Sequence, residues 1–139
     1  MDQKQKQELV NRAVGAAECA YAPYSNFHVG AVVLDDSGTL FTGCNVENVS
    51  YGLTCCAERV ALFKCISEGG GVVVAMALFS PDHKEPISPC GACRQVIMEL
   101  APGGLILMAG SNGSFVETTP AELLPGAFSF DEEQATAPL

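Results

Sequence analysis

The spacing of apolar residues predicts a helix and then a hairpin in the first third of the chain. Residues 3–21 carry apolar side chains near the helical period, and Pro23 ends this expected helix. Every second residue is apolar or aromatic over 27–33, which predicts a strand. A turn at 35–38 then connects that strand to a returning strand at 39–44.

The rest of the chain continues with the same kinds of element. Thr54 is a suitable N-cap for a helix over 55–67, and three consecutive glycines at 69–71 close it. Residues 72–79 are apolar throughout, which is typical of a strand covered on both faces. The remaining expected elements are a helix at 90–100, strands at 105–109 and 114–117, and a helical turn at 121–124. This order predicts an α/β fold, a three-layer α/β/α sandwich with a mixed five-stranded sheet.

Length and composition point to one folded domain. The chain has 139 residues, of which 48% are hydrophobic and 17% charged, and this is typical of a globular protein. We expect a single domain over 1–130 and a flexible acidic tail over 131–139. Seven basic and 16 acidic residues give a net charge of −9, which repels a phosphate backbone and argues against a nucleic acid polymer as partner.

The chain shows no signal for a membrane or for export. Its longest apolar run, 72–79, is shorter than the about 20 residues that cross a bilayer. Residues 1–7 are polar, so we expect no signal peptide. Seven cysteines in such a chain favour reduced thiols in the cytoplasm over a disulfide framework.

Three of the cysteines have the spacing of metal ligands. Cys90 and Cys93 are separated by two residues, so that both sulfurs can bind one ion from the first turn of the expected helix. Cys56 is expected in the first turn of the preceding helix. The partial positive charge at a helix N-terminus favours the thiolate form that binds metal. These three thiols predict a Zn²⁺ site.

The number of ligands separates catalytic from structural zinc, because a structural site fills all four tetrahedral positions with protein atoms. Cys55 adjoins Cys56, so on the expected helix its side chain points about 100° away and cannot share the ion. We interpret His28, on a strand, and His83, in a polar loop, as ordinary side chains. Three ligands therefore leave one position open. The alternative is a structural-zinc module with a fourth protein ligand.

Two charged residues lie close to Cys56 in the sequence. Glu58 can reach a water at the open position without binding the metal, which suits a general acid–base catalyst. Zinc with three thiolates carries one net negative charge, and this excess makes the ion a weaker acid. A guanidinium at Arg59 that hydrogen-bonds to the sulfurs would withdraw charge and restore the acidity.

These residues resemble a known signature. Cys56-x-Glu58 followed by Pro89-Cys90-x-x-Cys93 is similar to the pattern of zinc-dependent deaminases in which a cysteine takes the place of the first, otherwise histidine, ligand. The likeness covers the segments 24–31, 43–48, 56–59, 89–95 and 123–128, in that order. The chain therefore resembles the small homotetrameric zinc-dependent cytidine deaminases, and this resemblance implies the cytidine deaminase-like fold.

The resemblance implies hydrolytic deamination of cytidine and 2′-deoxycytidine to uridine and 2′-deoxyuridine, with release of ammonia, in pyrimidine salvage. It implies one Zn²⁺ per subunit, with Glu58 moving the protons. A deaminase of the same fold that acts on a free base, a nucleotide or an aminoglycosyl-type cytosine antibiotic is the nearest alternative. A neutral sugar is favoured, because a carboxylate at Glu47 would repel phosphate.

The resemblance also assigns substrate contacts. Asn45 and Glu47 correspond to residues that bind the ribose hydroxyls, and Phe27 to a ring that packs on the base. The main chain of Ala57, together with that of Cys90, would contact the edge of the base. The remaining residues of this kind, Tyr51 and Phe128, would be contributed by neighbouring subunits of a homotetramer.

Overall fold

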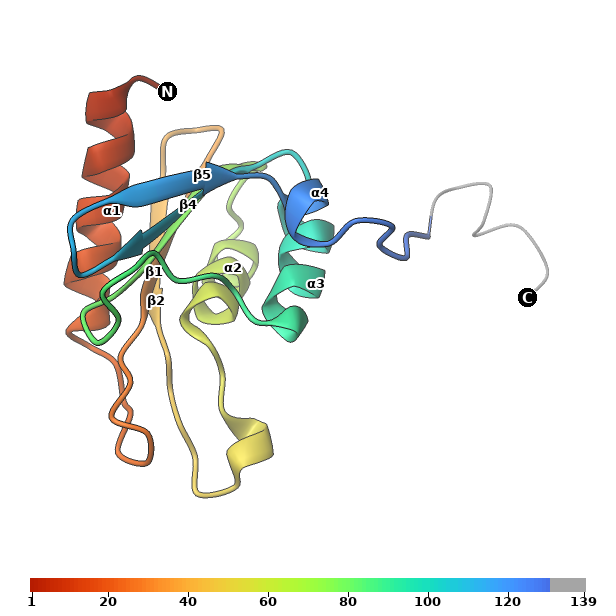
Figure 1. Ribbon diagram of the computed structural model, residues 1–139. Helices are drawn as coiled ribbons and strands as arrows, with labels where there is room; N and C mark the ends of the chain where they lie inside the picture. Colours follow the sequence, from red (N-terminus) through yellow and green to blue (C-terminus); the bar gives the residue numbers. More distant parts are fainter. Residues whose placement is uncertain (131–139) are drawn as a thin grey trace.

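A computed structural model describes residues 1–130 of the chain, and the expected tail at 131–139 lies outside the described residues. Five strands form one mixed sheet in the order β2-β1-β3-β4-β5 (Figure 1). Only the β3–β4 pair is parallel among the four neighbouring pairs of this sheet. The elements are α1 (Gln3–Ala17), β1 (Gly30–Asp35), β2 (Leu40–Cys44), the 3₁₀ turn η1 (Tyr51–Leu53), α2 (Ala57–Ser67), β3 (Val73–Ser80), α3 (Gly91–Leu100), β4 (Leu105–Gly110), β5 (Phe115–Thr118) and α4 (Pro120–Leu123).

Helices cover both faces of the sheet. α1 lies on one face, and α2 and α3 lie on the other with the short α4 beside α3 (Figure 1). Leu9 of α1 belongs to a buried cluster with Leu107 of β4. Leu62 of α2 and Ile97 of α3 belong to a second cluster, with Met76 of β3. Two apolar clusters on opposite faces of one sheet confirm the predicted three-layer α/β/α sandwich.

Two glycines let the helices approach the sheet closely. A Cβ at Gly30 would lie 2.1 Å from the Ala13 carbonyl oxygen of α1. A Cβ at Gly43 would lie 2.6 Å from the carbonyl oxygen of Ala57, the first residue of α2. Only glycine fits such backbone contacts. Gly43 therefore helps to set where α2 begins.

The segment between α1 and β1 differs from the sequence prediction. α1 ends at Ala17 instead of residue 21, because Tyr21 is drawn away into backbone hydrogen bonds with Asn45 and Glu47. β1 begins at Gly30, so the prediction of a strand from residue 27 was wrong for residues 27–29. The loops around Tyr21 and Asn45 extend side by side from the same end of the sandwich (Figure 1).

The helices of residues 1–130 include no candidate for a membrane-spanning segment. None of them has both the length and the apolar character that a bilayer crossing requires.

Candidate metal centre and active site

Three sulfur atoms converge where α2 and α3 begin. The Sγ atoms of Cys56, Cys90 and Cys93 all lie within 4.8 Å of one another, and those of Cys56 and Cys90 are 3.9 Å apart. Two sulfurs that bind one zinc at about 2.3 Å with tetrahedral angles lie roughly 3.8 Å apart. The three side chains therefore fit a zinc ion.

The helix starts differ from the sequence prediction by one or two residues. Cys56 and Cys90 are the N-caps of α2 and α3, with extended backbone, and do not lie in the first helical turns. Cys55 is also extended, and its backbone exchanges two hydrogen bonds with that of Val46. This pairing keeps residues 55 and 56 out of the helix, so Thr54 is not the cap. Within residues 1–130 the cluster contains no fourth histidine, cysteine or carboxylate.

The surroundings of the cluster favour the thiolate form at Cys56. A hydrogen bond with Cys93, helped by Arg59 and opposed by burial, lowers the pKa of the Cys56 thiol to about 5. The same pairing with Cys56, together with burial, raises the pKa of Cys93. The two thiols thus share one negative charge. Anionic sulfurs of this kind are what a soft divalent ion binds.

Arg59 lies against this cluster. Its Nη2 is 3.4 Å from the Sγ of Cys56, and the Cys56 thiolate is the main reason that the pKa of Arg59 is raised. The guanidinium therefore stays charged beside the sulfurs. This placement is the one that the charge balance of a three-thiolate zinc site predicts.

Glu58 is almost completely buried, with 4% of its surface exposed. Burial, followed by the charge on Cys56, raises the pKa of its carboxyl group. A carboxyl group with a raised pKa takes up a proton more readily than an exposed carboxylate does, which is what a general acid–base catalyst requires. Glu58 is therefore suited to shuttle protons beside the sulfur cluster, and an exposed helix glutamate would not be.

A cavity of about 310 Å³ opens beside the sulfurs. Most of the predicted substrate residues line it, namely Phe27, Asn45, Glu47 and Ala57, together with Cys56, Glu58 and Cys90. Ser25, Thr54, Leu78, Ile87 and Ser88 also line it and were not predicted. Ser25 stands two residues before Phe27 and could have been suspected, whereas no sequence signal marks Ser88.

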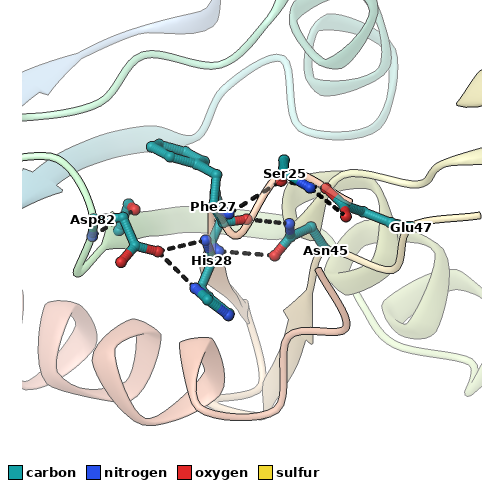
Figure 2. Close-up of polar contacts among 8 residues, drawn as sticks. Ser25, Phe27, His28, Asn45, Glu47 and Asp82 are labelled. Carbon is teal, nitrogen blue, oxygen red and sulfur yellow. Dashed lines mark hydrogen bonds and ion pairs between the residues drawn. The ribbon is translucent and has the colours of Figure 1, made fainter. Parts of the chain in front are cut away.

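Asn45 holds the backbone that carries Phe27. Its Nδ2 donates to the Phe27 carbonyl across 2.7 Å, and its Oδ1 accepts from the Val29 amide at 2.8 Å. Figure 2 shows the Phe27 ring turned away from this amide. On the far side of the segment, Asp82 accepts hydrogen bonds from both the backbone and the ring of His28 (Figure 2). Asn45 therefore does more than line the cavity.

Glu47 anchors the start of the same segment. Its carboxylate accepts from the Tyr24 amide at 2.9 Å and from the Ser25 amide at 3.2 Å, and it also accepts from the Ser25 hydroxyl (Figure 2). These bonds, led by that of the Ser25 hydroxyl, lower the pKa of Glu47. Glu47 is therefore an ionised acceptor on the cavity wall.

Two predicted substrate residues do not line this cavity. The exposed fraction of Tyr51 is 73%, and its ring meets that of Tyr24 edge-on, with centroids 5.7 Å apart. Tyr51 borders a separate hollow next to Glu47 and Thr54. Phe128 is 75% exposed and lies beyond α4, where the chain runs away from the sandwich (Figure 1). Neither ring completes the cavity of its own chain.

Comparisons with known proteins agree with this interpretation of the site. The sequence model of the cytidine and deoxycytidylate deaminase zinc-binding region matches residues 3–109. The chain belongs to this family. A cytidine deaminase of Halalkalibacterium halodurans is 51% identical over 128 residues, which cover 91% of this chain and 96% of that protein.

Solved structures of deaminases share the same architecture. The crystal structure of cytidine deaminase from Burkholderia pseudomallei superposes with a TM-score of 0.83 at 45% identity, covering 92% of this chain and 100% of that one. The cytidine deaminase of Mycobacterium tuberculosis gives a TM-score of 0.76 at 40% identity, with 92% and 99% covered. This deaminase is therefore a hydrolytic enzyme whose three cysteines fit one zinc ion per subunit. Membership of this enzyme family argues against a structural-zinc module without catalysis.

Proposed function

We propose that the protein converts cytidine and 2′-deoxycytidine to uridine and 2′-deoxyuridine with release of ammonia, and that it serves pyrimidine salvage. The domain responsible would span residues 1–130. The observation that carries the proposal is the buried Glu58 beside three clustered thiols, in the lining of a cavity of about 310 Å³. The relatives named cytidine deaminase support the choice of cytosine as the base.

Each step of the hydrolysis needs a proton carrier. Zinc held by Cys56, Cys90 and Cys93 would supply a Lewis acid that makes water a nucleophile at neutral pH. Glu58 takes a proton from the attacking water and delivers it to N3 of the base, so that C4 becomes electrophilic. After water adds to C4, Glu58 moves the remaining proton to the exocyclic amine, which leaves as ammonia. Such proton transfer contributes about 10²–10⁴-fold to the rate.

Other residues of the cavity would hold the nucleoside. The Phe27 ring packs on the base, and the main chain of Ala57 and Cys90 contacts its polar edge. Asn45 keeps one N–H and one lone pair beyond its two backbone contacts, and an ionised Glu47 can accept from sugar hydroxyls. Two such groups on one wall suit the hydroxyls of a ribose.

The charge of the cavity argues against phosphorylated substrates. Glu47 is ionised at neutral pH, and the chain carries a net charge of −9. A phosphate group placed near this carboxylate would be repelled. The same charge disfavours a nucleic acid polymer as substrate, so the partner we propose is a small neutral nucleoside.

Exposed aromatic rings support assembly into a homotetramer. Tyr51 and Phe128 each leave about three quarters of their surface in solvent, where a neighbouring subunit could cover them. In an assembly each ring could reach the cavity of a neighbouring subunit. Seven free thiols, three of them zinc ligands, in turn support a reducing compartment, and we place the enzyme in the cytoplasm.

The decisive experiment follows the loss of cytidine absorbance in the ultraviolet. Zinc-loaded protein is offered cytidine, 2′-deoxycytidine, cytosine and cytidine monophosphate at equal concentrations. We expect both nucleosides to be deaminated and the base and nucleotide to react far more slowly. Sedimentation or light scattering on the same sample should give the mass of four chains. Absence of turnover with either nucleoside would overturn the proposal.

A further inference from the structure

Arg94 directs its guanidinium toward the loop that carries a zinc ligand. Its Nε donates to the Pro89 carbonyl across 2.8 Å, and its Nη2 donates to the Ser88 hydroxyl across 2.6 Å. Its Nη1 donates to the carbonyl of Leu123, the last residue of α4, at 2.8 Å. One half-buried side chain thus joins three acceptors from two separate segments.

The acceptors of Arg94 are all uncharged. Within residues 1–130 the ion pairs join Lys6 to Glu117 and His28 to Asp82, and neither includes Arg94. Hydrogen bonds from a charged donor are shorter and stronger than those between neutral groups. The planar guanidinium also fixes the directions of its donors. These properties suit Arg94 to holding backbone in place.

The segment that Arg94 holds has few backbone hydrogen bonds of its own. Residues 81–90 form neither helix nor strand, and the nearest backbone hydrogen bond before Cys90 runs from the Ile87 amide to the Ala109 carbonyl at 3.3 Å. Pro89 is bonded directly to Cys90, whose sulfur belongs to the zinc cluster. A displaced Pro89 carbonyl would therefore displace a metal ligand.

Ser88 connects Arg94 with the substrate cavity. Its side chain lines the wall that also includes Phe27 and Glu58. Because the Ser88 oxygen accepts from Arg94, its hydroxyl hydrogen remains available to a substrate group in the cavity. Arg94 thereby holds a hydroxyl group that belongs to the cavity wall.

We infer that Arg94 is a positioning residue for the zinc centre and the substrate cavity. Its guanidinium fixes the segment from Ser88 to Cys90 and ties it to the end of α4. The residues after α4 carry Phe128, so the same side chain connects the metal loop with the segment that presents this ring. The effect of Arg94 on substrate binding rests on the proposed function, whereas its effect on zinc retention does not.

Two kinds of measurement test this role in zinc-loaded protein. Transfer of zinc to an excess of a chromophoric chelator gives a release rate that is independent of catalysis. Loss of charged hydrogen bonds should make Arg94→Gln release zinc about tenfold faster or more. The same variant should raise the KM for cytidine more than it lowers kcat. Arg94→Lys keeps the charge but cannot span three acceptors, so it should not restore either value.

Arg12→Gln is the control, because Arg12 is exposed on α1, on the opposite face of the sheet, and should leave both values unchanged. Zinc release from Arg94→Gln at the wild-type rate would refute the role in the metal centre. If Arg94→Gln does not fold, Ser88→Ala decides, because it removes one acceptor and should raise the KM several-fold. An unchanged KM in that variant refutes the role in the cavity. Wild-type protein that binds zinc but leaves cytidine intact refutes only the proposed function.

Discussion

The side-chain amide of Asn45 pairs with the backbone on both sides of His28, donating to Phe27 and accepting from Val29. It therefore takes the place of a neighbouring strand for residues that lie just before β1. Phe27 owes its position to this amide, and the ring that we propose for base packing is held by a residue that we also propose for sugar binding. Asn45 thus connects the two halves of a nucleoside site.

Asn45→Ala should consequently weaken binding of the base as well as the sugar. Two backbone groups lose their partners, at a cost of about 1–3 kcal/mol each to the folded segment. We expect about 1.4 kcal/mol of this cost to reach base binding, which makes inhibition by free cytosine roughly tenfold weaker. The inhibition constant of cytosine against cytidine turnover measures this. Asn48→Ala is the matched control, because Asn48 is exposed on the same loop and outside the cavity. If the inhibition constant of cytosine is unchanged in Asn45→Ala, Asn45 does not contribute to binding of the base.

Glu58→Gln should retain the fold and the zinc but lose turnover. The amide fills the same buried space and cannot carry a proton, so kcat should fall by about 10²–10⁴-fold or more. Absorbance of cytidine gives the rate, and elemental analysis gives the zinc content. A Gln variant that remains active would remove Glu58 from its proposed role.

Cys90→Ala should abolish stable zinc binding. Two sulfurs with an incomplete coordination shell hold zinc far more weakly than three. Zinc content after dialysis against a mild chelator checks the outcome. Cys55→Ala is the control, since Cys55 is the neighbour of a ligand and lies outside the cluster. Full zinc occupancy in Cys90→Ala, equal to that of the control, would show that Cys90 is not a zinc ligand.

Arg59→Gln should lower both the affinity for zinc and the catalytic rate. The variant loses a charged hydrogen bond to Cys56 Sγ, an interaction of about 1.5–3 kcal/mol, which corresponds to roughly tenfold or more. Arg59→Lys keeps the charge and should recover part of the loss. Competition with a chelator of known affinity gives the zinc constant. Activity and affinity equal to wild type in Arg59→Gln would contradict the charge argument.

Asp35 should make the fold sensitive to acid. Its carboxylate accepts from the Ser37 hydroxyl and from the backbone amides of Gly71, Thr39 and Ser37, and these bonds lower its pKa from 3.8 to about 2. Because the folded-state pKa is lowered, the stabilisation is present above pH 3.8 and is lost as the pH falls toward about 2.

Asp35→Asn should therefore be less stable at neutral pH and lose less stability over that acid range. Urea unfolding of the zinc-free, reduced protein at several pH values measures both effects, since zinc release then does not contribute. Equal acid sensitivity in wild type and variant would show that Asp35 is not the group responsible.

Much of the fold follows from local patterns in the sequence. Strands such as β3 and β4 are continuous apolar runs bounded by glycine or proline, so the number of strands and their succession along the chain could be predicted. The three cysteines could be found because the ligands of one ion stand at short, characteristic separations. Glu58 and Arg59 could be suspected only through their nearness to Cys56.

The sequence predictions of element boundaries were wrong where residues distant in sequence supply the hydrogen bonds of the backbone. Residues 27–29 alternate like a strand, yet Asn45 and Asp82 supply the hydrogen bonds that a strand partner would give. The start of α2 moves to Ala57 because Cys55 pairs with Val46. Arg94 lies in the segment 89–95 that resembles deaminases, but its role could not be predicted, since the Leu123 carbonyl meets it only in the folded chain.

Cys56 and Cys90 occupy the N-cap positions of α2 and α3, yet neither side chain caps its helix with a hydrogen bond. Their sulfurs instead gather at the positive ends of both helix dipoles, where negative charge is favoured. A zinc ion bound by these sulfurs would therefore join two helices that β3 and its flanking loops separate in the sequence. Oxidation of these sulfurs, or removal of the ion by a chelator, would therefore weaken the contact between the starts of α2 and α3 together with the chemistry of the cavity.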